Sequence, residues 1–117
     1  MTDRMIARRE FLRESSASRL RIIGECLAAI GGLLLDGFDE AVKEKIDEAT
    51  WLIEWAVPDE VHDIQVELVE LQQALHEWRG ELPAIAAVAA AREGIRDQAC
   101  VWSEWLMWMS ALLEATA

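Results

Sequence analysis

The sequence predicts an all-α protein, most simply a four-helix bundle with long first and last helices that self-associates. Apolar residues recur at intervals of three and four along the chain, which is the spacing of helices packed face to face. The chain has 117 residues, of which 53 % are hydrophobic and 28 % charged, and this is the size and composition of one globular domain. We therefore expect residues 1–117 to form a single helical-bundle domain, within which residues 1–21 are a basic N-terminal helical arm.

The first helix is expected over residues 3–35. Serine hydroxyls near Ser15 compete for backbone hydrogen bonds, so the helix is expected to bend there. Gly37, directly after Asp36, is expected to supply the C-cap, because glycine adopts the left-handed conformation that helix ends use. One side of this helix carries a stripe of small residues that lets a neighbouring backbone approach closely, namely Gly24, Ala28 and Gly31.

The second helix is expected over residues 38–57. The third is expected to begin at Pro58, since proline suits a first helical position, and to end at Gly80. The fourth is expected over residues 83–113. The third helix has the clearest apolar seam, with residues spaced by four and three as in packed helices: Val57, Val61, Ile64, Leu68, Leu71, Leu75, Trp78 and Leu82.

The charge balance favours a protein partner over nucleic acid or membrane. Acidic residues number 22 against 11 basic ones, a formal net charge of −11, and such a chain repels phosphate backbones and anionic lipid. A basic protein surface fits better. Cys26 and Cys100 stand alone, and an export signal is not visible, so we expect a cytoplasmic protein. Catalytic triads and glycine-rich nucleotide loops are not found either, which favours a non-enzymatic protein without a cofactor.

A ladder of carboxylates runs along the third helix, one residue before most of the seam positions, with a gap at Ala74. Like charges at this spacing repel, so three interpretations are open: a solvated surface, a face for a basic partner, or a cation site. We predict a protein-interaction module, such as an adaptor, inhibitor or assembly protein, that uses the carboxylate-rich faces of the second and third helices. Trp51 lies within the acidic stripe of the second helix and is expected to be exposed and ringed by acids, as a binding hot spot is. The expected partner-binding residues are Trp51, Glu60, Asp63, Glu67, Glu70 and Glu77.

An enzyme is the alternative. The spacings Glu44-x-x-Asp47 and Glu67-x-x-Glu70 are similar to the paired acidic motifs of all-α nucleoside triphosphate pyrophosphohydrolases of the MazG kind, with the acids in a different order from that family's ExxE and ExxD pairs. The resemblance implies that these four carboxylates hold Mg²⁺ or Mn²⁺ for nucleotide hydrolysis. If the two helices turn back near Pro58, Asp47 lies level with Glu67.

The six tryptophans are a second anomaly, and three of them fall within seven residues of the fourth helix. Three interpretations are open: an intramolecular core, a surface for a homodimer or larger homo-oligomer, and a pocket for a hydrophobic ligand. The residues concerned are Trp102, Trp105, Trp108 and Met109.

The N-terminal arm is basic, with six Arg and three acidic residues over residues 1–21. Two interpretations are open for its arginines. They dock on the acidic part of the chain, in the same or a second subunit, or they pair with Glu10 and Glu14 on their own helix. The residues concerned are Arg4, Arg8, Arg9 and Arg13.

Overall fold

A computed structural model describes residues 3–37, 39–85 and 88–116. All regular structure in these ranges is helical, so the predicted all-α class is confirmed. No helix in the described part of the chain offers an apolar stretch of bilayer-spanning length. The elements in chain order are α1 (Asp3–Leu12), α2 (Ser16–Asp36), α3 (Asp39–Ala56), the short 3₁₀ helix η1 (Val57–Asp59), α4 (His62–Ile85) and α5 (Ala89–Thr116).

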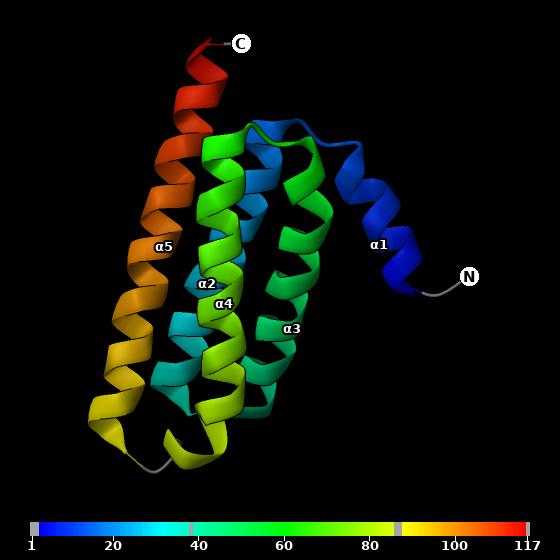
Figure 1. The fold of residues 1–117 in the computed structure, drawn as a ribbon. Helices are drawn as coiled ribbons and strands as arrows, with labels where there is room; N and C mark the ends of the chain where they lie inside the picture. Colours follow the sequence, from blue (N-terminus) through cyan, green and yellow to red (C-terminus); the bar gives the residue numbers. More distant parts are fainter. Residues whose placement is uncertain (1–2, 38, 86–87, 117) are drawn as a thin grey trace.

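The four longer helices, α2 to α5, run alternately in opposite directions (Figure 1). Helix α2 packs most extensively against α5 and next against α3, and α3 packs against α4. Helix α1 lies to one side, against α3 (Figure 1). Helix α1 reaches the core at its C-terminal end, through Phe11.

The predicted long first helix is wrong, because residues 3–36 form two helices. Ser15 has extended backbone angles, φ −66° and ψ 163°, and its Oγ accepts a hydrogen bond from the backbone N–H of Ser18 at 3.1 Å. A serine that satisfies an otherwise unpaired N–H in this way is an N-cap. The serine cluster therefore begins a new helix where a bend was expected.

Gly37 ends α2 as predicted. It has φ 79°, and its N–H points to the carbonyls of Leu33 and Leu34, which is how a left-handed cap satisfies the last turn of a helix. The predicted end at Gly80 is wrong, because α4 continues to Ile85. Leu82, beyond the glycine, is buried with the rest of the seam, and that burial outweighs the roughly 1 kcal/mol that glycine costs in a helix.

The predicted helix starts differ from the observed ones in two places. Pro58 lies in η1, and α4 begins at His62. The fourth long helix begins at Ala89, because Pro83 still belongs to α4. The start expected at Phe38 lies outside the described residues.

The core is formed by apolar residues of α2, α3, α4 and α5, and Phe11 of α1 joins it. The α4 seam is buried from Ile64 to Leu82, as its periodicity predicts, whereas Val61 lies before the helix and is exposed. Two buried serines of α5 donate to carbonyls of α2: Ser103 Oγ to Gly24 at 2.8 Å and Ser110 Oγ to Ala17 at 2.6 Å. These hydrogen bonds fix α5 against α2.

A buried arginine joins three elements at one end of the molecule. Arg19 of α2 donates through Nη2 to the carbonyl of Leu12, the last residue of α1, at 2.6 Å. Its Nη1 lies 3.1 Å from Asp59 Oδ2 of η1. Ser16 Oγ donates to the carboxylate of Glu60 nearby. The charged groups at this junction therefore hold the elements together.

Candidate binding groove between α1 and α3

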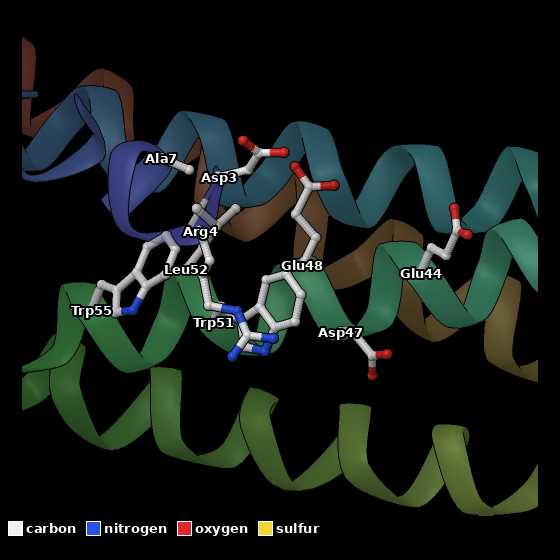
Figure 2. A pocket seen from close by; sticks show the side chains of 9 residues that line it. All are labelled: Asp3, Arg4, Ala7, Glu44, Asp47, Glu48, Trp51, Leu52 and Trp55. Carbon is white, nitrogen blue, oxygen red and sulfur yellow. The ribbon is translucent and has the colours of Figure 1, made fainter. Parts of the chain in front are cut away.

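A groove of about 690 Å³ lies between α1 and α3. Helix α3 contributes one wall, with two tryptophans and three carboxylates, and α1 contributes the other (Figure 2). Acidic and aromatic groups therefore line the same space. The lining residues are Asp3, Arg4, Ala7, Glu44, Asp47, Glu48, Trp51, Leu52 and Trp55.

A positively charged side chain of the protein itself, Arg4, lies in this groove. The guanidinium carbon of Arg4 lies 3.6 Å from the centre of the Trp51 ring, and Figure 2 shows the Arg4 side chain reaching across from α1 to the indole. The negative face of an indole attracts a cation, and such a contact is worth about 0.5–1 kcal/mol at an exposed site. The groove is therefore chemically suited to a positively charged side chain.

A second aromatic contact anchors the other end of α1. The rings of Phe11 and Trp55 lie 6.1 Å apart at 54°, and Phe11 is the buried residue of this helix. Ala7, between Arg4 and Phe11, also lines the groove. These three positions are spaced i, i+3 and i+7, so they share one face of α1.

The carboxylates of the groove already have some partners. Asp47 Oδ1 lies 3.1 Å from Nε of Arg79 on α4, and Glu48 Oε2 lies 2.9 Å from Nζ of Lys45. This hydrogen bond from Lys45 to Glu48 raises the pKa of Lys45. The ion pairs among the described residues do not include Arg4 or Glu44, so Arg4 is held by the indole, and Glu44 presents an exposed charge.

The expected ladder on α4 is exposed only in part. Asp63, Glu70 and Glu77 are exposed and Glu67 is half-buried, so these four can meet a partner. The assignment of Glu60 to partner binding is wrong. This side chain is 8 % exposed and accepts a hydrogen bond from Ser16, because η1 turns it inward against α2.

The four carboxylates of the enzyme alternative do not assemble. Within the described ranges, three or more acidic, histidine or cysteine side chains are nowhere grouped closely enough to hold a metal ion. Asp47 lies against Arg79, and Glu67 is twelve residues away along α4, about 18 Å at the helical rise. The expected alignment of Asp47 with Glu67 is therefore wrong, because the η1 segment and the two residues after it set a different register.

The tryptophans that the sequence singles out for binding or self-association lie in three environments. Trp51 is half-buried beneath Arg4, so its expected full exposure is wrong, although carboxylates do lie on the same groove. Trp102 and Trp105 form an edge-to-face pair, with ring centres 6.0 Å apart. They pack, with Met109, against the core. Trp108 is 60 % exposed.

The arginines of the N-terminal arm also lie in different surroundings. Arg4 docks on the acidic and aromatic wall of its own chain, a contact between residues 47 positions apart that no local pattern announces. Glu14, expected as a partner of these arginines, accepts a hydrogen bond from Ser18 Oγ at 2.8 Å. Arg8, Arg9 and Arg13 line a different hollow, on α1 and the turn that follows it.

The chain matches no family model, no curated protein and no solved structure at a level that shows kinship. Its function therefore has to be argued from its own residues.

Proposed function

We propose that the protein is a non-enzymatic interaction module that binds a basic segment of a partner protein in the groove between α1 and α3. The observation that carries the proposal is the guanidinium of Arg4 over the ring of Trp51. The same groove is lined by Glu44, Asp47 and Glu48, which supply the opposite charge. An aromatic face with carboxylates beside it suits the guanidinium or ammonium group of a partner.

The acidic surface continues beyond the groove. Glu77 of α4 and Thr50 of α3 line a second groove, of about 620 Å³, between these two helices. Asp63 and Glu70 are exposed on α4. With a net charge of −11 on the chain, such a surface speeds the approach of a basic partner, and the aromatic groove supplies the specific contact.

Titration of the wild-type protein with a synthetic peptide of the α1 sequence, DRMIARREFL, tests this proposal by fluorescence anisotropy. We expect saturable binding that weakens as the salt concentration rises from about 0.05 to 0.5 M, because salt screens exposed charges. Trp51→Ala is expected to weaken binding several-fold, because it removes the aromatic face. A peptide with two of its three arginines, Arg4 and Arg8, replaced by glutamine is expected to bind less well than the unchanged peptide.

Two double variants that remove equal charge provide the matched control. Glu44→Gln with Glu48→Gln removes two charges from the groove, and Glu67→Gln with Glu70→Gln removes two from α4. The proposal expects the first pair to weaken binding more than the second. If the α4 pair weakens it more and Trp51→Ala has no effect, the binding surface is the ladder expected from the sequence and the groove proposal is wrong.

We also propose that α5 mediates self-association. Val101 and Trp108 are 65 % and 60 % exposed, and Leu112 is exposed as well. Spaced i, i+7 and i+11, they share one face of α5. Large exposed apolar groups on one helix face are typical of an interface between copies.

Sedimentation equilibrium tests the second proposal. The wild-type protein is expected to form a dimer or larger oligomer at micromolar concentration, and Trp108→Gln with Val101→Ser is expected to shift it to monomer. Val66→Ser with Val69→Ser, which changes two exposed valines of α4, is the control and is expected to leave the assembly intact. A wild-type protein that stays monomeric at all concentrations contradicts the proposal.

A further inference from the structure

We infer that α1 is a displaceable internal ligand of the groove, which a basic helix from a partner must replace in order to bind. This inference rests on the proposed function and adds its regulation and the pattern of its ligand. It starts from the observation that the wall facing Trp51 and Trp55 is a separate short helix of the same chain, which joins the core through Phe11 (Figures 1 and 2).

The attachment of α1 is uneven along its length. Residues 3–10 are all exposed, and Phe11 is the buried residue of the helix. The C-terminal end is fixed by the contact of Phe11 with Trp55 and by the hydrogen bond from Arg19 to the Leu12 carbonyl. At the N-terminal end, Arg4 contacts Trp51. Opening the groove at Trp51 therefore begins with the loss of the Arg4 contact with the indole.

If α1 leaves the groove, it pivots at the short segment that joins it to α2. Residues 13–15 join α1 to α2, and Ser15 is already in an extended conformation, with ψ 163°. Because Ser15 caps α2, α2 keeps its first turn whether or not α1 is docked. Phe11 is the residue by which α1 joins the core, so displacement of α1 uncovers that site but leaves the first turn of α2 capped.

The docked face of α1 indicates what a competing ligand looks like. Arg4, Ala7 and Phe11 meet the groove, which corresponds to an arginine, then a small residue three positions later, then an aromatic residue four positions after that. A partner helix with this pattern reproduces each contact. It gains more than α1 does if its arginine also reaches Glu44 or Glu48, since Arg4 is not in the ion pairs found among the described residues.

Because α1 is tethered by only three residues, it competes at an effective concentration on the order of millimolar. Removing its contact with Trp51 should therefore improve the binding of an external helix. For Arg4→Ala we expect the affinity for the DRMIARREFL peptide to rise about two- to fivefold, the ratio that corresponds to the loss of one exposed cation–π contact.

Arg8→Ala is the matched control. It removes the same charge from the same helix, but Arg8 lines a different hollow, so the affinity is expected to stay near the wild-type value. Equal gains in the two variants would mean that only net charge matters, and would overturn the inference.

Hydrogen exchange of the backbone amides gives the second measurement. A helix of ten residues is too short to persist alone in water, so a displaced α1 becomes coil. With saturating peptide, we expect the amides of residues 3–12 to exchange faster while those of α2 to α5 keep their protection. Unchanged protection of α1 in the peptide complex would overturn the inference.

The two proposals fail in different ways. If the peptide binds neither the wild-type protein nor Arg4→Ala, the proposed function itself is wrong. If it binds both proteins equally and α1 stays protected, the groove proposal survives and only the displacement of α1 is refuted.

Discussion

Ser103 Oγ of α5 donates a buried hydrogen bond of 2.8 Å to the carbonyl of Gly24 on α2. The two helices approach closely at this point: a Cβ added to Gly24 would lie 3.2 Å from Leu106 Cβ and 3.4 Å from the Ser103 carbonyl oxygen. Gly24 is therefore a packing residue, as the small-residue stripe of α2 predicts. Gly32 lies on the same helix in a different environment: a Cβ added there has nothing within 4 Å.

This difference predicts that alanine substitutions at the two glycines change the free energy of unfolding by different amounts. Gly32→Ala should raise the free energy of unfolding by about 0.5–1 kcal/mol, because alanine is the better helix former and meets no neighbour. Gly24→Ala should gain less or lose stability, because its methyl group forces α5 to shift. Urea unfolding of both variants measures this, and equal gains would contradict the packing argument.

Arg19 should contribute more to stability than its neighbour Arg21. Arg19→Met leaves the Leu12 carbonyl and Asp59 without their donor, and we expect a loss of about 1–3 kcal/mol. Arg21 is an exposed residue that pairs with Glu114 at 3.6 Å, so Arg21→Met should cost at most about 1 kcal/mol. Equal losses in urea unfolding would show that the buried junction is not a stabilising feature.

Stability should fall at alkaline pH because of Cys26. Burial, with a smaller contribution from Glu48, raises the pKa of this thiol from 9.0 to about 12. The folded state therefore favours the protonated thiol. This contribution is complete below pH 9 and is lost as the pH rises toward 12, at about 1.4 kcal/mol per pH unit.

Comparison with Cys26→Ala isolates this effect. Lys45, whose pKa is also raised, titrates in both proteins. Over the alkaline interval, the free energy of unfolding should therefore fall more steeply for the wild-type protein than for the variant. Parallel curves would contradict the assignment.

The two thiols should differ in reactivity toward a disulfide reagent. Cys26 is buried and Cys100 is exposed, so the native protein should react at one cysteine and the unfolded protein at both. The negative charge of Glu104 raises the pKa of Cys100, which lowers the thiolate fraction. Glu104→Gln should therefore speed the reaction of Cys100, whereas Glu114→Gln, farther along α5, should not. A slower reaction of Glu104→Gln would contradict this.

The helical class and the buried seam of α4 could be predicted from the sequence because both depend on local periodicity. Ile64 and Leu75 share a face however the helices are arranged, and Gly37 ends α2 through its own backbone geometry. Gly80 and Pro83 were misleading for the opposite reason. Their local preference is opposed by tertiary burial at Leu82, which the sequence pattern does not weigh.

Only one side of the candidate site could be predicted. Trp51 with Glu44 and Asp47 stands out as an acidic stripe interrupted by an indole, because these residues share a face of one helix. The contact with Arg4 depends on where α1 lies in space, and the pairing of Asp47 with Arg79 depends on the turn after α3. The burial of Arg19, in contrast, is indicated by the sequence, because Arg19 lies four residues before Ile23 and so shares the buried face of α2.

The position of α1 also determines at which end the protein can carry a tag or a surface linker without blocking the groove. Asp3 lies on the groove, whereas Thr116 ends α5 on the other side of the molecule (Figure 1). An affinity tag or surface linker placed before α1 would itself lie at the mouth of the groove and obstruct it. A tag placed after α5 leaves the groove open, so the same protein immobilised by its two ends should behave as two different reagents.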